Sequence, residues 1–232
     1  YGPVSLEEAE KVKLKETEVG MIPDEWKVVA LKDIAEFKNG INFEAEQKGN
    51  KGILTIDVLN MYGPGISVNL LNLYRVNKKI KDSYLLKDGD ILFVRSSLKQ
   101  EGVGWTTLFR AMNEPVTFCG FLIRGRLIRN EIDAEYLTNY LRTDTARNNL
   151  VASSGKVAIT NINQGMLGRI NIPLPPLPTQ QKIASILSVI DEKIQAEENK
   201  KKALEDLFKS MLHNLMTAKI RVKDLNVEVE NV

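Results

Sequence analysis

The residues best suited to chemistry in this chain are two acidic side chains and a lysine. Pro23-Asp24, followed by Glu36-Phe37-Lys38, matches the loose nuclease pattern PD…(D/E)xK. In that pattern two carboxylates hold Mg²⁺ and the lysine assists the attacking water. The pattern is very degenerate in a chain that is 27% charged, and the segment around Asp24 is typical of a helix or turn. A self-contained, homodimeric Mg²⁺-dependent nuclease is therefore one alternative.

Cysteine and histidine are too scarce for most other site chemistry. Cys119 is the only cysteine and His213 the only histidine, too few for a disulfide framework, a catalytic triad or a zinc site of these ligands. The VTFCGFLI setting of Cys119 favours an inert buried thiol. Walker A, G-x-G-x-x-G and H-E-x-x-H motifs are absent from the sequence. We expect no catalytic residue and no metal site, and a reducing, cytoplasmic setting.

Basic side chains are concentrated in the middle of the chain. The formal net charge is only +2. Residues 1–50 carry 7 basic against 11 acidic side chains, residues 75–129 carry 11 against 5, and residues 140–178 carry 4 against 1. A polyanion such as nucleic acid fits the middle of the chain better than its ends, although a solvated basic face has the same composition.

The elements that must position these residues are short strands and helices. The length of 232 residues corresponds to one or two domains. Residues 53–59, 90–95, 116–128 and 169–174 predict strands, and residues 134–151 predict a helix. We expect an α+β fold, with a mixed α/β domain followed by a long helix. No uncharged apolar run approaches 18 residues, so we expect no membrane span.

The ends of this domain carry their own signals. Ser5 and Glu8 form a capping-box pattern, which predicts a helical N-terminal extension over 1–19. Four of the eight prolines fall between 173 and 178. Proline lacks the N–H and disfavours helix at the preceding residue, so this run predicts a stiff, extended hinge. Residues 218–232 are a C-terminal tail.

A heptad pattern follows the hinge. It predicts a helix over 179–217, about 58 Å long at 1.5 Å per residue. The seam is polar in the middle, where Glu197 and Lys201 occupy seam positions. We expect a homodimer through antiparallel helices; a lone helix lying on its own domain, or a coiled-coil adaptor with no DNA role, are the alternatives. The apolar seam residues are Ile183, Leu187, Ile190, Ile194, Leu204, Phe208, Met211 and Leu215.

Several stretches carry more specific marks. They are GMIPDEWKVVALKDI at 20–34, LKDGDIL at 86–92, Ser154-Gly155-Lys156, and IPLPPLPTQQKIASILSVIDEKI at 172–194. In this order they resemble the opening of a target recognition domain, its central strand, and its exit into a conserved spacer helix, in the specificity subunits of type I restriction–modification enzymes. Thr179 stands where that family commonly has glutamate, and threonine also caps a helix.

The resemblance implies a recognition domain over 20–172, the hinge over 173–178 and a spacer helix over 179–217 that pairs and docks modification subunits. It implies a DNA sequence-specificity subunit that performs no catalysis and holds no cofactor. In the family, S-adenosylmethionine serves the modification subunits, and ATP and Mg²⁺ serve the partner subunits, among them a restriction subunit. Typical members have two recognition domains and two spacer helices, so this chain is either a half-sized subunit or half of a longer one.

Two polar loops are the candidates for contact with double-stranded DNA. We expect the domain to contact a half-site of about 3–5 base pairs through base edges in the major groove, while basic residues contact phosphates. Twofold symmetry implies a bipartite, inverted-repeat target. For each candidate the alternative is an ordinary solvated loop residue. The first loop supplies Arg95, Ser96, Ser97, Lys99 and Gln100, and the second supplies Lys156, Thr160, Asn161, Asn163 and Gln164.

Overall fold

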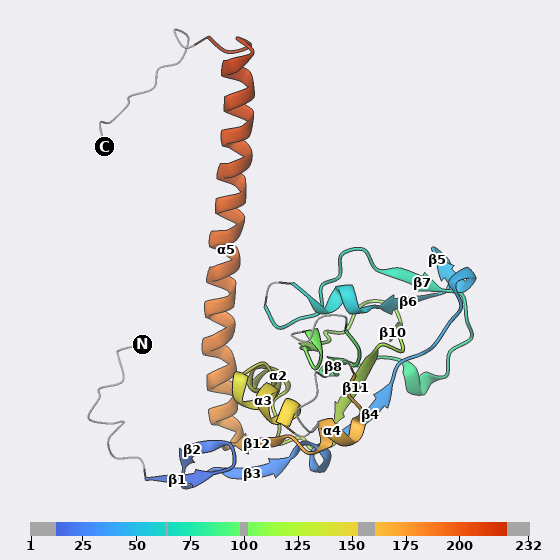
Figure 1. Cartoon of the computed structure of the whole chain (residues 1–232), viewed down its shortest axis with the longest axis vertical. Coiled ribbons are helices and arrows are strands. Elements are labelled where there is room, and N and C mark those ends of the chain that lie inside the picture. The colour runs from blue at the N-terminus through green and yellow to red at the C-terminus, as the bar shows by residue number, and fades with distance from the viewer. Residues whose placement is uncertain (1–12, 64, 98–101, 153–160, 222–232) are drawn as a thin grey trace. The chain divides into compact units, whose positions relative to one another are not determined.

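The fold is given by a computed structural model, which describes residues 13–63, 65–97, 102–152 and 161–221 (Figure 1). The chain divides into two compact units, of which the first ends at Leu187 and the second begins at Ser188. The boundary falls inside helix α5 (Leu177–Met216), not in the predicted hinge. The reason is that the first turns of α5 pack into unit 1, where Gln180 and Ala184 are buried.

Sheets form the frame of unit 1. Among the described residues there are two four-stranded sheets, with strand orders β4-β11-β8-β9 and β10-β6-β7-β5, and two two-stranded pairs, β1-β2 and β12-β3. All pairs are antiparallel except β10 and β6. The strands are β1 Leu14–Thr17, β2 Gly20–Pro23, β3 Lys27–Ala30, β4 Ala35–Asn39, β5 Lys48–Gly49, β6 Ile53–Ile56, β7 Tyr74–Val76, β8 Ile91–Val94, β9 Thr106–Leu108, β10 Val116–Phe118, β11 Leu122–Leu127 and β12 Asn171–Leu174.

The sheet β4-β11-β8-β9 separates two hydrophobic cores, because successive strand residues point to opposite faces. Ile123 and Phe93 lie in the core that also contains Leu137 and Leu150, from the helices. Leu122 lies on the other face, in the core shared with β6 and β10. The helices are α2 Ala134–Leu141, α3 Asp144–Ala152, α4 Gln164–Gly168 and α5, with 3-10 turns η1 Leu31–Asp33, η2 Ala45–Gln47, η3 Val58–Met61 and η4 Asp82–Tyr84.

Several predicted elements are divided in the structure. Residues 134–151 form α2 and α3 with a break at Thr143, whose hydroxyl accepts a hydrogen bond from Ala146 N–H at 3.3 Å and so starts a new helix. Residues 116–128 form β10 and β11, because the chain turns between them. The predicted strand 53–59 ends at Ile56, where Asp57 caps η3.

The N-terminal prediction is wrong for its described part. Residues Leu14–Thr17, predicted as helix, form β1, which pairs with β2 in a hairpin. The tight turn is stabilised by Thr17 Oγ1, which donates to Gly20 O at 2.7 Å, and by Gly20 at φ +102°. A domain beginning at residue 20 would divide this hairpin. Ser5 and Glu8 lie outside the described residues.

The proline run is also organised differently from the predicted hinge. Pro173 belongs to β12, opposite Val28 of β3 in a two-stranded pair. Such an edge tolerates a residue without an N–H. Pro178 lies in the first turn of α5, where backbone N–H groups have no helical acceptor. The helix therefore starts at Leu177, earlier than the predicted residue 179, and only 175–176 lie between the two elements.

Within the ranges that the structure describes, helix α5 is long enough to span a bilayer, but neither it nor any shorter helix is apolar enough to do so.

Candidate nucleic-acid interface

Four strands of unit 1 end at the same turn. Strands β4 and β8 both pair antiparallel with β11, so their carboxyl ends lie where β11 begins. Strands β6 and β10 are parallel and end there as well. Backbone N–H groups join this turn to the neighbouring strand ends at 2.8–3.0 Å: Gly40 donates to Leu122 O, Arg95 to Phe121 O and Cys119 to Ile56 O. We call this region, residues 39–42, 57, 95–97, 119–122 and 161–164, the strand-end corner.

The corner brings the two candidate loops together. Ser96 and Asn161 form an antiparallel β-bridge, and Ile162 N–H donates to Arg95 O at 2.9 Å. Asn161 is exposed, whereas Ser96 and Ser97 are half-buried. The sequence offered no sign of this pairing. Four of the candidates lie outside the described residues: Lys99, Gln100, Lys156 and Thr160.

The remaining candidates differ in what their side chains do. Arg95 Nη1 donates to Gly120 O at 3.2 Å, which anchors one of the five guanidinium donors to the turn. Gln164 Nε2 donates to Asn39 Oδ1 at 3.1 Å. Asn163 Oδ1 accepts from Met166 N–H at 2.9 Å and so caps α4. Asn163 thus has a structural role in α4.

A cavity of about 320 Å³ opens beside these loops, lined in part by Asn42, Tyr74 and Phe121. On its wall the Asp57 carboxylate accepts hydrogen bonds from Tyr74 Oη at 3.0 Å and Cys119 Sγ at 3.2 Å. Burial, and then the charge of Asp57, raise the pKa of both the tyrosine hydroxyl and the thiol. Both groups are therefore neutral donors at physiological pH, as an inert Cys119 requires.

Sequence reasoning missed the corner residues outside the two loops. Asn39 ends β4 and Asp57 directly follows β6, so polar residues at predicted strand ends were an available signal. Phe121, which is 61% exposed, precedes β11 directly. Tyr74 carried no such signal, because it reaches the cavity only through the pairing of β7 with β6.

Two lysines lie beside the corner. Lys78 Nζ donates to Asn42 O at 2.7 Å, and Lys48 Nζ lies 3.9 Å from the centre of the Tyr74 ring. Both lysine side chains are exposed. Lys48 Nζ also lies 4.0 Å from Asp57 Oδ2 in an ion pair. The corner therefore combines fixed polar groups with nearby exposed cations, which is compatible with a polyanion partner.

The proposed nuclease residues do not come together in a comparable way. Asp24 lies in the turn after β2, whereas Glu36 and Lys38 lie on β4. The Lys38 ammonium donates to Ser83 Oγ at 2.8 Å and lies 4.2 Å from the centre of the Tyr84 ring. Across the described ranges, no group of three His, Cys, Asp or Glu side chains is arranged to hold a metal ion.

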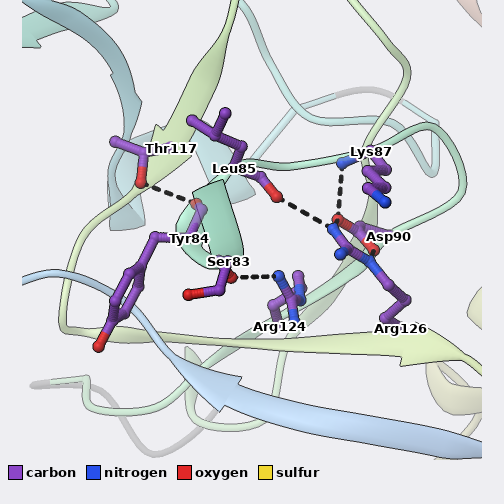
Figure 2. Close-up of polar contacts among 8 residues, drawn as sticks. All are labelled: Ser83, Tyr84, Leu85, Lys87, Asp90, Thr117, Arg124 and Arg126. Atoms are coloured by element: carbon purple, nitrogen blue, oxygen red, sulfur yellow. Dashed lines mark hydrogen bonds and ion pairs between the residues drawn. The ribbon is translucent and has the colours of Figure 1, made fainter. Parts of the chain in front are cut away.

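The Gly-Asp-Ile-Leu segment supports the frame at the opposite end of β8. Gly89 adopts φ +80° in the turn before the strand. The Asp90 side chain, 1% exposed, accepts Lys87 N–H at 2.7 Å. It also accepts hydrogen bonds from Arg126 Nε at 2.7 Å and from Arg126 Nη2 at 2.6 Å, and these two contacts form a two-point ion pair (Figure 2). These hydrogen bonds raise the pKa of Arg126.

Side chains of β10 and β11 donate hydrogen bonds to three successive backbone carbonyls at η4, those of residues 83–85. As Figure 2 shows, Arg124 donates to Ser83 O at 3.1 Å, Thr117 to Tyr84 O at 3.0 Å and Arg126 to Leu85 O at 3.0 Å. Burial lowers the pKa of Arg124, which stands 6% exposed on β11. Asp90 therefore belongs to a buried charge network that supports β8 and, through it, Arg95.

Residues 23–206 match the family described as type I restriction modification DNA specificity domain. The chain belongs to this family. This specificity domain is 27% identical over 220 residues to the type I restriction enzyme MjaVIII specificity subunit of Methanocaldococcus jannaschii, covering 94% of this chain and 51% of the relative. It is 32% identical over 208 residues to the putative MjaX specificity subunit of the same organism, covering 88% and 48%.

Solved structures agree on the fold. A chain from a study of the assembly and conformational transition of the type I R-M system has a TM-score of 0.61 at 20% identity, covering 88% of this chain and 47% of that one. The HsdS subunit from Thermoanaerobacter tengcongensis has a TM-score of 0.55 at 20% identity, covering 83% and 45%. The α+β fold with a long final helix is thus confirmed, and this specificity domain spans about half the length of the curated relatives it matches.

Proposed function

We propose that the chain is a non-catalytic DNA sequence-specificity subunit of a type I restriction–modification system, acting in the cytoplasm. It binds one half-site of a bipartite target in double-stranded DNA and directs modification subunits, and a restriction subunit where one is present, to that site. S-adenosylmethionine, ATP and Mg²⁺ serve those partners. Membership of the specificity-domain family supports this role. We choose the strand-end corner as the DNA-binding surface because the β-bridge between Ser96 and Asn161 brings the two candidate loops together there.

The chemistry of the strand-end corner suits base recognition. Arg95 offers further guanidinium donors, and Asn161 and Gln164 offer amides, which are side chains that pair with guanine and adenine edges in the major groove. Backbone hydrogen bonds fix the positions of Arg95 and Ile162, which flank the bridge between Ser96 and Asn161. Exposed lysines nearby, such as Lys48 and Lys78, are placed to contact phosphates.

The direct test is to express the chain together with the modification subunit of its system. The molecular mass of the purified complex is measured, and the methylome of the cells is sequenced. We expect a stable complex and methylation confined to a bipartite motif. A complex that methylates without sequence preference would contradict the proposal. So would DNA cutting by the purified chain with Mg²⁺ that Glu36→Ala abolishes, which would support the nuclease alternative instead.

Arg95→Ala is expected to relax the motif at one base position. If the guanidinium makes a two-point contact with a guanine, its loss costs about 1–3 kcal/mol at that position and little elsewhere. The measurement is competition binding of the assembled complex against sites with single base changes. Arg129→Ala is the matched control, because Arg129 follows the far end of β11 and pairs with Glu131 at 3.7 Å. An equal loss of affinity for all DNA sequences would mean that Arg95 contacts a phosphate and not a base.

The exposed apolar face of α5 supports pairing with a second copy. Ile190, Ile194 and Phe208 are 49%, 51% and 67% exposed. Within α5, all of which the structure describes, only Gln180 and Ala184 are buried. An apolar seam at heptad spacing, left in water, favours a partner helix. In the proposed antiparallel homodimer the opposite face of each helix docks a modification subunit.

The double variant Leu187→Asp, Leu215→Asp is expected to abolish the dimer. It would place charges in an apolar seam, at a cost of several kcal/mol. Analytical ultracentrifugation of the purified chain measures the result. The control Ser185→Asp, His213→Asp adds two aspartates at positions outside the seam on the same helix, and should stay dimeric. A Leu187/Leu215 variant that remained a dimer would show that these residues do not form the dimer interface.

A further inference from the structure

The Gln180 side chain forms hydrogen bonds that join the start of α5 to neighbouring segments of unit 1; we call this contact the joint. Its side chain is 0% exposed. Its Oε1 accepts from Asp133 N–H at 2.9 Å, while its Nε2 donates to Glu131 O at 3.0 Å and to Pro175 O at 2.8 Å. One amide in the first turns of the helix is therefore bonded both to the loop before α2 and to the segment that enters α5.

The groups around Gln180 belong to one continuous network. The Asp133 side chain caps α2 by accepting Tyr136 N–H at 2.8 Å. Tyr136 Oη in turn donates to Pro173 O at 2.7 Å, and Tyr140 Oη to Asn171 O at 3.1 Å. The starts of α2 and α5 and the whole of β12 are thus joined by directional bonds, all of them within unit 1.

An apolar side chain could fill this buried position without any hydrogen bond. Packing alone fixes the direction of a helix only to within about 15–20°, because apolar contact is itself non-directional. Three hydrogen bonds with defined geometry restrict it, and a helix that breaks them leaves the buried Gln180 amide without partners. The network therefore selects one orientation of the first turns of α5.

We propose that Gln180 is a positioning residue that makes the complex strict about the spacing between its two half-sites. The inference rests on the proposed function, in which a pair of α5 helices separates two recognition domains. Gln180 contributes no base contact; it acts by fixing the recognition domain to the start of its own helix.

Small rotations at this joint matter on the scale of DNA. A domain of this size has a radius of gyration of about 16 Å, so its far surface lies roughly 40 Å from a joint at its edge. A rotation of about 5° over that distance moves the surface by about 3.4 Å, the rise of one base pair. A joint that lets the domain rotate by this amount supplies the rise of one base pair. The twist of about 34° that the same base pair carries is left to the DNA, so a spacer one base pair longer or shorter becomes better tolerated but not equal to the native one.

The test compares Gln180→Met with the wild type in complex with the modification subunit. Methionine keeps most of the buried volume and removes all three hydrogen bonds. The readout is methylation of DNA substrates with the native spacer and with spacers one base pair longer or shorter. We expect the preference for the native spacer to fall about tenfold, with unchanged bases in each half-site. Gln181→Met, on the exposed neighbouring glutamine, should keep the wild-type preference.

Each outcome bears on a different claim. A folded Gln180→Met complex as strict as the wild type would overturn the inference while leaving the proposed function intact, and a wild-type complex without a bipartite motif would overturn the function itself. A variant that is merely unstable loses methylation on all spacers alike, which would also count against positioning. If Gln180→Met does not fold, Tyr136→Phe removes one bond of the same network and should relax the spacing in the same direction, to a smaller extent.

Discussion

Asp90→Ala is expected to lower the free energy of unfolding by about 3–5 kcal/mol. The carboxylate is almost fully buried, and its loss leaves the Arg126 guanidinium without its two-point partner. The substitution removes the stronger of the two opposite charges, Asp90 and Glu36, that act on Arg124. It also frees Lys87 N–H at the turn before β8. Urea denaturation followed by circular dichroism measures the change.

A matched control is Glu114→Ala, which removes the partner of Arg75 in an ion pair of 2.8 Å on the surface. Water replaces that partner, so the change should be far smaller than at Asp90. Equal effects of the two substitutions would mean that the buried network adds nothing beyond an ordinary surface pair. A stable Asp90→Ala protein with a relaxed DNA motif would instead place Asp90 in recognition.

Deleting residues 195–201 is expected to abolish modification of the native site. The deletion removes one heptad from the polar centre of α5, keeps the seam in phase and shortens the helix by about 10.5 Å. In the proposed antiparallel pair the two domains lie at opposite ends, so their separation falls by about 3 base pairs at 3.4 Å each. Methylation of substrates with graded spacer lengths measures the effect.

The deletion variant should recover only partly on a site shortened by about 3 base pairs. Those base pairs also carry about 100° of helical rotation, which a phase-preserving deletion does not supply. DNA bending or twisting would have to absorb the difference, at a cost of a few kcal/mol. Replacing 195–201 by a different polar heptad of equal length is the control. If the deletion variant methylates the site with native spacing at the wild-type rate, helix length does not set the spacing, and the helix serves only to dock other subunits.

Local patterns predicted five of the twelve strands in the described residues, β6, β8, β10, β11 and β12, together with helices α2, α3 and α5, but not where these elements begin and end. β-Branched and aromatic residues marked 116–128 as strand, while the turn that divides it into β10 and β11 is stabilised by backbone hydrogen bonds with the ends of β4, β6 and β8. Residues 14–17 became a strand because β2 pairs with them. Pairing partners far apart in the chain are not contained in a local pattern, so boundaries and strand order could not be derived.

The candidate site divides in the same way. Arg95 stood out by residue type and by its place at the end of a predicted strand, and Asn161 by its place in a polar cluster near the end of the domain. Their proximity depends on a bridge between segments 65 residues apart. Asp57 joins them only because β6 lies beside β10. Gln180 was marked by its place in a family pattern, and its hydrogen bonds to the loop before α2 could not be inferred from that pattern.

The four residues of β8 separate two regions with opposite requirements. At one end, Asp90 is bound to so many neighbours that nearly any substitution would disturb the frame. At the other end, Arg95 and Ser96 are held mainly through their backbones, which every residue except proline can supply. New side chains can therefore be exchanged at the corner without altering the support beneath it. A domain organised in this way can evolve toward different DNA targets while its fold stays the same.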